Sequence, residues 1–419
     1  MSEKEVENLK KMIRAACAIM FIACIVLFGG IIFLRENMPE QFSVVGGSEL
    51  KIEGAVTAKT TGNSGADSAM QVTMISPGNS YTASLKLFGL FPIKEITVKV
   101  VDATSVIPSG APFGIKMYTD GVLVVGMSEV DSADGQKNPA RSAGIKVGDV
   151  IISMNTQTVL TTEQVANIVE VSGGSPIVVR IRRSNIEFDV NLIPEKSVNE
   201  NRYKAGLWVR DSSAGIGTLT FIMPDSNIFG GLGHAICDVD TGEIIPLSSG
   251  KVVPARIYSV VRGQVGQPGE LRGGFEAGSL GNITINAETG VYGVLDSAYT
   301  AGEAVPVAMK QQVKTGYAQI LCTIDGTTPQ YYDIEIEQVR YNDSSPTRNM
   351  TVRITDPRLL DKTGGIIQGM SGSPILQDGM LVGAVTHVLV NDPERGFAIF
   401  AENMLRTATS QTAAQKPAA

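Results

Sequence analysis

The hydrophobic pattern of the chain consists of one unbroken apolar run near the N-terminus, followed by a long remainder in which apolar and polar positions alternate. The run, residues 15–34, carries no charge and would span about 30 Å as a helix, which matches a bilayer core. Lys10, Lys11 and Arg14 precede the run, so we expect residues 1–14 to stay in the cytosol and the bulk to be exported. A cleaved signal peptide is the alternative, but no small-x-small site follows the run.

Residues 40–104 alternate between apolar and polar side chains in short stretches. The clearest are residues 81–88 and 93–101, and Gly/Ser-rich loops such as residues 60–68 separate the stretches. Period-two alternation bounded by turn residues predicts strands. No residues that carry chemistry accompany them, so we interpret residues 40–104 as a small β-rich spacer domain.

Residues 105–194 combine strand and helix patterns. A continuous apolar stretch at 121–126 predicts a buried strand, residues 139–145 a short helix, and residues 148–155 a turn into a second strand. Residues 161–171 are amphipathic with a helical period, and residues 176–182 alternate as a strand.

This order of elements resembles the PDZ domains of bacterial exported proteases, most specifically over residues 140–155. The resemblance implies an α+β PDZ domain at 105–194. It also implies that a short loop binds a peptide carboxylate through its backbone N–H groups while the peptide adds as a strand; its residues would be Phe113, Gly114, Ile115 and Lys116. A PDZ-shaped module that only packs on its neighbours is the alternative.

Length and composition limit the classes of function. A chain of 419 residues with 45 glycines is too long for one domain of usual size and favours β-structure with many turns. The net charge of −7 and the absence of a Lys/Arg cluster argue against a nucleic-acid partner. Two distant histidines and no C-x-x-C motif argue against a metal site. Cys237 and Cys322 could form a disulfide or remain free thiols.

The run Gly369–Pro374, with the sequence Gly-Met-Ser-Gly-Ser-Pro, carries the candidate chemistry. Small residues on both sides of Ser371 let the backbone turn sharply, as in the chymotrypsin-like proteases, so the N–H groups of Gly369 and Ser371 would form an oxyanion hole. The following residues predict a hairpin. By the same resemblance its second strand would pair with substrate through Thr386, His387 and Val388.

A serine nucleophile needs a general base, and the chain has only two histidines. His234 precedes Ser371, which is the chymotrypsin-like order, whereas His387 falls in the predicted substrate strand. A carboxylate must hold the base. Asp296 and Asp356 each end an apolar strand, and the pattern alone does not choose between them.

The whole arrangement resembles the stage IV sporulation protein B peptidases of endospore-forming bacteria. The most specific segments are residues 213–221, 233–234, 238–242 and 363–375. The resemblance assigns the catalytic histidine to His234, the serine to Ser371 and the acid to Asp356, with Asp296 as the alternate acid and no cofactor. Chymotrypsin-like enzymes place the acid nearer the histidine, which leaves the assignment of Asp356 open.

The resemblance further implies a mainly β fold: an N-terminal transmembrane helix, the small β-domain, the PDZ domain and a chymotrypsin-like double β-barrel serine peptidase domain at 200–408, with a disordered tail at 409–419. The family acts from the forespore inner membrane into the intermembrane space. Its members process themselves, in trans through the PDZ domain, and cleave a regulator of an intramembrane metalloprotease, which activates the late mother-cell sigma factor. A catalytically inactive, membrane-tethered PDZ adaptor is the alternative.

Overall fold

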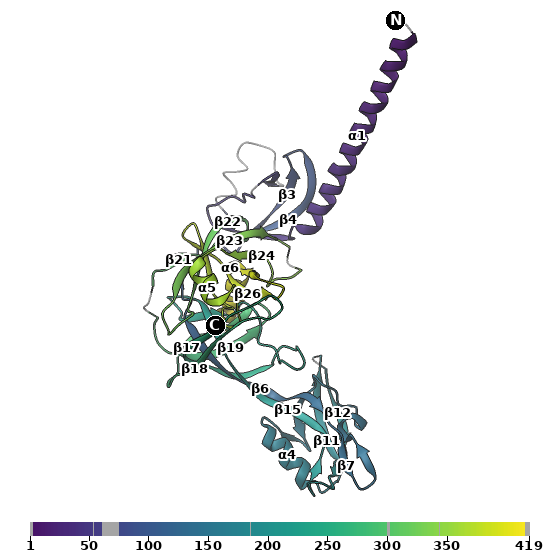
Figure 1. The fold of residues 1–419 in the computed structure, drawn as a ribbon, viewed down its shortest axis with the longest axis vertical. Coiled ribbons are helices and arrows are strands. Elements are labelled where there is room, and N and C mark those ends of the chain that lie inside the picture. The colour runs from purple at the N-terminus through teal and green to yellow at the C-terminus, as the bar shows by residue number, and fades with distance from the viewer. Residues whose placement is uncertain are drawn as a thin grey trace.

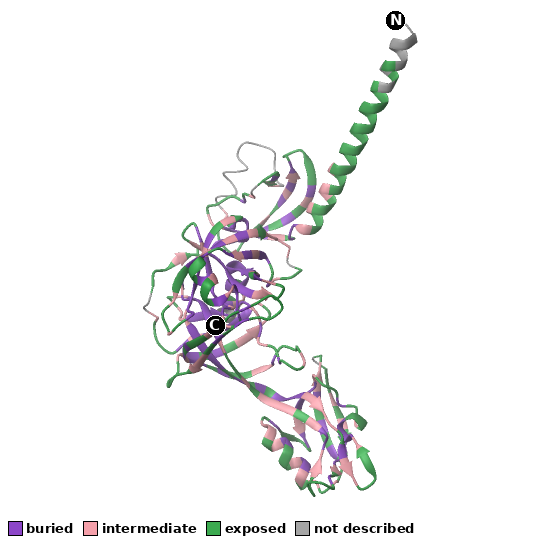
Figure 2. Cartoon of the chain, in the orientation of Figure 1, coloured by how far each residue is buried: buried purple, intermediate pink, exposed green. Residues whose placement is uncertain are grey.

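The computed structural model describes residues 3–52, 54–60, 75–184, 186–299, 302–342 and 344–414. A long N-terminal helix projects from a small sheet, which lies against a larger body of strands, and a further unit extends from the opposite end of that body (Figure 1). Buried residues concentrate in the central body, whereas the projecting helix is exposed along most of its length (Figure 2). The fold is mainly β, as predicted.

The helix α1 (Glu3–Asn37) contains the predicted apolar run. Its segment Met12–Asn37 is long and apolar enough to cross a membrane, and none of its most apolar window is buried within the protein. Among its described side chains, those that pack against the next domain lie near its C-terminal end, namely Leu27, Ile31 and Leu34. The helix is therefore a candidate single membrane span, as the sequence predicted.

The small domain is a four-stranded sheet in the order β1, β4, β3, β2, formed by β1 (Gln41–Val45), β2 (Val56–Thr60), β3 (Ser80–Leu87) and β4 (Phe91–Val101). Strand β1 is parallel to β4, and the other pairs are antiparallel. The loop predicted at residues 60–68 lies, from residue 61 on, outside the described residues. The domain is docked on the body, because Ser43 donates a 2.7 Å hydrogen bond to Glu402 and Phe42 packs edge-on against Tyr341.

Six strands of the body form a first barrel. They pair in the order β6, β17, β19, β20, β16 and β15, and β15 pairs back with β6, which closes the ring. The strands are β6 (Pro112–Met127), β15 (Leu207–Ile222), β16 (Ile228–Gly231), β17 (Leu247–Val261), β19 (Gly281–Ala287) and β20 (Gly290–Leu295). Strands β5 (Ser105–Pro108), β18 (Glu270–Phe275) and β21 (Val305–Pro306) extend its sheet.

The PDZ unit is an insertion into this barrel, and the long strands β6 and β15 connect the two (Figure 1). It contains α3 (Pro139–Ser142) and α4 (Thr162–Val171), and the Thr161 hydroxyl caps α4 by accepting a bond from the Gln164 N–H. Its strands are β7 (Val130–Ser132), β8 (Gly135–Lys137), β9 (Val150–Met154), β10 (Gln157–Thr158), β11 (Ile177–Arg183), β12 (Ile186–Leu192), β13 (Glu195–Lys196) and β14 (Tyr203–Lys204).

The predicted boundary of the PDZ domain at residue 105 was wrong. Strand β5 and the first half of β6 pair with β15 and β17 within the barrel, and only from about Gly121 onward does β6 contribute to the PDZ core. Chain order misled the prediction because β6 is one strand shared by the two units.

A second barrel closes from β22 (Gly316–Cys322), β23 (Gln330–Val339), β24 (Met350–Ile354), β27 (Asp392–Phe400), β26 (Met380–Leu389) and β25 (Pro374–Gln377). The 3-10 turn η1 (Lys310–Gln312) precedes it, α5 (Pro357–Thr363) leads into the Ser371 loop, and α6 (Ala401–Ala414) ends the described chain. The predicted tail at 409–419 is therefore helical to Ala414, and residues 415–419 lie outside the described residues.

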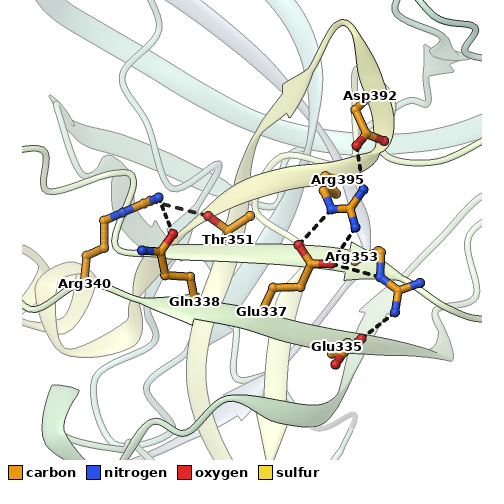
Figure 3. A network of polar contacts seen from close by, with 8 residues as sticks. All are labelled: Glu335, Glu337, Gln338, Arg340, Thr351, Arg353, Asp392 and Arg395. Atoms are coloured by element: carbon orange, nitrogen blue, oxygen red, sulfur yellow. Dashed lines mark hydrogen bonds and ion pairs between the residues drawn. The ribbon is translucent and has the colours of Figure 1, made fainter.

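Charged side chains form a ladder across three neighbouring strands of the second barrel (Figure 3). Glu337 on β23 accepts hydrogen bonds from Arg353 on β24 and Arg395 on β27, and Arg395 also donates to Asp392. Because bidentate Arg–carboxylate contacts have a fixed geometry, this ladder holds the outer side of β27, the strand that pairs with β26. Strand β26 in turn carries Thr386 and His387.

Candidate active site

Ser371 lies in the tight loop between α5 and β25, where the two barrels meet. Gly369 and Gly372 on either side have φ of +96° and +94°, a backbone conformation that glycine adopts without strain. A Cβ at Gly372 would lie 2.2 Å from the Thr218 carbonyl oxygen on β15. Glycine is therefore required here both by the turn and by the close approach of the first barrel.

The Ser371 loop is bonded to both barrels. The Thr218 hydroxyl donates to the Gly369 carbonyl at 2.8 Å, and the Thr218 N–H donates to the Ser371 carbonyl at 3.2 Å. The Gly372 N–H donates to Val385 on β26 at 2.7 Å. Within the described residues, the N–H groups of Gly369 and Ser371 have no hydrogen-bond acceptor. These are the two donors expected of an oxyanion hole. The loop that carries them is fixed by its other hydrogen bonds, and the two N–H groups remain available for a ligand oxygen.

The Ser371 hydroxyl donates a 2.8 Å hydrogen bond to the backbone carbonyl of Thr386. The pairing of β26 with β27 shifts register between Val385 and His387, so Thr386 lies at a bulge. Its own hydroxyl bonds to the carbonyls of Thr347 and Phe397. The edge of β26 that faces Ser371 has no strand partner beyond Val385 in the described chain. Residues Thr386, His387 and Val388 are thus free to pair with an extended peptide, and their role as the substrate strand stays a prediction.

His234 follows strand β16 and lies at the same cleft. A Cβ at the preceding Gly233 would meet the Thr386 side chain at 2.9 Å, so the histidine loop is packed directly against β26. The Nδ1 atom of His234 lies 2.8 Å from the Ala235 carbonyl. The tautomer that carries its hydrogen on Nδ1 donates this bond, which leaves Nε2 with the lone pair of a base. Burial lowers the pKa of His234 below its usual value of 6.5.

His387 lies beside His234, with a distance of 5.2 Å between the ring centroids. Burial, His234 and Arg348, in that order, lower the pKa of His387 to about 4. Its Nδ1 is buried without a hydrogen-bond partner in the described structure. Both imidazole rings are thus neutral near pH 7. The sequence had placed His387 only in the substrate strand and had not indicated its contact with His234.

A cavity of about 330 Å³ contains the reacting groups. Ser371, Gly369 and His234 share it with residues 213–217 of β15 and with residues 235–237 and Val239 of the histidine loop. A serine and a neutral imidazole that line one cavity, with two unused N–H donors beside the serine, are the apparatus of acyl transfer from a peptide.

Comparison with protein families agrees with this chemistry. The model of the family described as SpoIVB peptidase S55 matches residues 201–405, and a PDZ domain model matches residues 135–183. The chain is therefore a serine peptidase, and residues 201–405 are its SpoIVB peptidase S55 domain. No curated protein matched the chain in a sequence search.

Solved structures that are distantly similar to this chain include crystal structures of the Rv3671c protease of M. tuberculosis. The active form shares 16% identity, covers 49% of this chain and 78% of its own, and has a TM-score of 0.27. The inactive form shares 15% identity, covers 46% of this chain and 83% of its own, and has a TM-score of 0.26.

Neither candidate acid contacts the histidine of this S55 peptidase. Asp356 caps α5. Its carboxylate accepts hydrogen bonds from the Asp333 N–H and from the backbone N–H and the guanidinium of Arg358. The guanidinium is the largest of the causes that hold the pKa of Asp356 at about 2, and the backbone N–H donors add to it. Asp296 is exposed and accepts bonds from Ser279 and Asn282. Among the described residues, no hydrogen bond joins either carboxylate to His234. The assignment of Asp356 as the triad acid stays a prediction.

The predicted carboxylate loop at residues 113–116 was wrong. These residues lie inside β6, where β15 pairs on one side and β17 on the other, so their N–H groups face neighbouring strands. Phe113 is fully buried in the first barrel. The PDZ unit instead has a groove of about 310 Å³ between α4 and the segment from Arg202 to Val209, with Val165, Ala166 and Val169 on its helix side.

Two further features complete the site of the S55 peptidase. No cluster of three or more metal-ligating side chains occurs in the part of the chain that the structure describes, and Cys237 and Cys322 are both free thiols.

Sequence reasoning missed Thr218, although it lies within the segment 213–221 that carried part of the resemblance. Its role depends on contact with a loop that is distant in sequence, so no local pattern could have indicated it.

Proposed function

We propose that the chain is an exported, membrane-anchored serine endopeptidase of sporulation signalling that processes itself and cleaves a regulator of an intramembrane metalloprotease, which activates the late mother-cell sigma factor. The observation that carries the enzymatic part is the common cavity of Ser371, His234 and the unused N–H groups beside them. The S55 family match supports the signalling part.

The residues perform the reaction in two steps. The Ser371 hydroxyl rotates from the Thr386 carbonyl toward His234, whose Nε2 accepts its proton as Oγ attacks the substrate carbonyl. The N–H groups of Gly369 and Ser371 stabilise the oxyanion. His234 then protonates the leaving amine as the C–N bond breaks, and water hydrolyses the acyl-enzyme by the same route. The Ala235 carbonyl, through Nδ1–H, keeps the histidine in the required tautomer.

The anchor and the PDZ groove support the location and the partners. The apolar helix α1 would hold the protein in the forespore inner membrane with its bulk in the intermembrane space, until self-cleavage releases it. The groove between α4 and β15 would bind a strand of the protein substrate or of another copy of the chain. Both partners are proteins, and the proposal requires neither a nucleic acid nor a cofactor.

Labelling by a fluorophosphonate probe tests this proposal, because the probe reacts only with an activated serine. We expect the full-length protein in detergent to be labelled and to cleave β-casein. Ser371→Ala should abolish both, and His234→Ala should lower turnover by a factor on the order of 10⁴. An unlabelled wild-type protein would indicate the inactive adaptor, and a greater loss from His387→Ala than from His234→Ala would reassign the base.

A further inference from the structure

The turn between β3 and β4 of the small domain, residues 87–93, is apolar and exposed. Its sequence, Leu-Phe-Gly-Leu-Phe-Pro-Ile, contains no charged or polar side chain, although hairpin turns in water favour Asn, Asp and Gly. Phe88, Leu90 and Phe91 are 66%, 75% and 40% exposed. Phe88 also has a φ of +52°, a conformation that a bulky side chain rarely adopts. This apolar turn therefore has the composition of a contact surface for an apolar partner.

The apolar turn is directed back along α1. Strand β4 runs parallel to β1, and Gln41 at the start of β1 pairs with Thr97, so residues 91–96 of β4 extend past that start toward the helix. The Lys94 amine donates a 2.7 Å hydrogen bond to the carbonyl of Met38, the residue that follows α1. In Figure 1 the turn between β3 and β4 points to the same side as the N-terminal end of α1.

The apolar turn lies at the level of the membrane segment of α1. Phe91 precedes Lys94 by three positions, which is about 10 Å along a strand. The same rise along α1 from Met38 reaches about residue 31, because a helix rises about 1.5 Å per residue. Ile31 lies within the candidate span Met12–Asn37 and packs against the apolar core of the small domain. A bilayer around this span would therefore also meet the apolar turn.

We propose that the apolar turn inserts its three exposed apolar side chains into the bilayer leaflet on the side of the small domain, as a second membrane contact beside α1. This inference rests on the membrane anchor of the proposed function and deepens it. Side chains of this size reach the boundary of headgroups and acyl chains, about 5–10 Å deep. Lys86 precedes the turn and residues 86–94 include no acid, which suits anionic lipid headgroups.

The backbone of the apolar turn is compatible with an apolar environment. The Phe88 N–H donates to the Ala55 carbonyl at 2.7 Å, and the Leu90 N–H donates to the Leu87 carbonyl at 3.1 Å. Leu87 also pairs with Phe91 at the end of the hairpin. Because a bilayer penalises backbone groups that have no partner, these bonds lower the cost of insertion.

A second membrane contact would restrict the rotation that a single helix allows. The small domain is bound to the peptidase body, since the Ser43 hydroxyl donates to Glu402 and the Gln311 side chain donates to the Ser43 carbonyl at 2.7 Å. Insertion of the apolar turn would therefore determine which side of the peptidase body faces the membrane.

Tryptophan fluorescence in vesicles tests the insertion. Full-length protein with Ser371→Ala, which prevents self-processing, and Trp208→Phe, which removes the only tryptophan, is reconstituted in equal parts of phosphatidylcholine and phosphatidylglycerol. Leu90→Trp reports on the apolar turn, and Ser80→Trp, at an exposed position at the far end of the same hairpin, is the matched control. Lipids brominated on their acyl chains should quench Leu90→Trp at least twofold and leave Ser80→Trp nearly unchanged.

Carbonate extraction separates this inference from the anchor on which it rests. If the protein resists extraction and the two variants are quenched equally, or neither is quenched, the inference is overturned and the anchor stands. Protein that carbonate removes from the vesicles overturns the anchor itself, and the inference with it.

Cross-linking to lipid gives a second readout without a substitution in the small domain. A phospholipid with a diazirine on its acyl chain should cross-link the Ser371→Ala protein within residues 86–94 as well as within α1. Residues 95–101, the second half of β4, should remain unmodified. Cross-links confined to α1 contradict insertion of the apolar turn.

Discussion

The Ser371 hydroxyl and the Thr386 carbonyl are joined by a 2.8 Å hydrogen bond, which holds the nucleophile on the strand expected to pair with substrate. Attack requires the hydroxyl to leave this carbonyl and turn to His234. A substrate N–H that pairs with Thr386 would compete for the same oxygen. Substrate binding and release of the nucleophile thus involve one atom.

Thr218 positions the oxyanion hole through its hydroxyl bond to the Gly369 carbonyl. Thr218→Val keeps the shape and removes that bond, so the peptide unit between Gly369 and Met370, which links the two oxyanion donors, is less restrained. We expect kcat to fall about tenfold with KM nearly unchanged, since a complete loss of one donor costs about 10²–10³. Thr218→Ser should restore most of the activity.

Thr220→Val is the control. The Thr220 hydroxyl donates to the carbonyl of Gly372, which follows both oxyanion donors in the loop. Both valine variants remove one buried hydrogen bond and should lose a similar stability, about 1 kcal/mol. If Thr220→Val lowers kcat as much as Thr218→Val, the effect is one of general loop stability rather than of oxyanion geometry.

The depressed pKa values of the two histidines predict the acid response. Because burial lowers the pKa of His234 below 6.5, the acidic limb of kcat/KM should have its midpoint below pH 6.5. The folded pKa of His387 is about 4, so the unfolded chain binds this proton first as pH falls. Stability should therefore decrease from about pH 6.5 toward pH 4.

His387→Gln should flatten that decrease in urea denaturation midpoints, since glutamine does not titrate. Lys146→Gln, which removes one charge in the PDZ unit, serves as the comparison. An unchanged slope in His387→Gln would show that His387 titrates normally in the folded protein.

Asp356 and Asp296 should differ in stability. Asp356→Asn weakens the cap of α5 and the Arg358 contact, and we expect a loss of about 1–2 kcal/mol at pH 7. Since the folded pKa of Asp356 is about 2, this stabilisation is complete above about pH 4 and is lost as pH falls toward 2. Asp296→Asn should change stability by less than about 0.5 kcal/mol.

The pH profile separates this structural role from a catalytic one. A carboxylate that orients His234 raises the pKa of the imidazole, so its loss would move the acidic limb to lower pH. We expect Asp356→Asn to reduce activity in proportion to folded protein, with the limb unmoved. A shifted limb in Asp356→Asn would establish it as the triad acid, and a shifted limb in Asp296→Asn would establish the alternate.

The PDZ groove should affect protein substrates alone. Ala166 lies exposed on the groove side of α4, and Ala166→Trp would fill the groove, whereas Asn167→Trp adds the same bulk at an exposed position outside it. We expect Ala166→Trp to lower self-processing in trans at least fivefold without changing hydrolysis of p-nitrophenyl butyrate. Equal behaviour of the two variants would mean that the groove binds no substrate. Gly114 is unsuitable for this test, because a Cβ there meets Phe275 and Val253 at 2.6 Å.

The sequence alone determined the features that depend on neighbouring residues. The uncharged run 15–34 forms a helix, and the glycines beside Ser371 take positive φ and leave two N–H groups unused, because these properties arise from local composition and backbone sterics. The periods of residues 148–182 likewise predicted the strands and the helix of the PDZ unit, which are stabilised largely by their own apolar faces.

Only the tertiary structure decided which distant residues meet. The PDZ resemblance made residues 113–116 a loop, yet they pair with β15, whose partner residues lie 98–104 positions on, and with β17, whose partner residues lie 135–141 positions on. The contact of Thr218 with Gly369 and the placement of Asp356 on Arg358 instead of His234 are likewise set by the closure of the barrels. Hydrogen bonds between strands satisfy backbone groups that every residue carries, so side-chain pattern alone does not identify the partner.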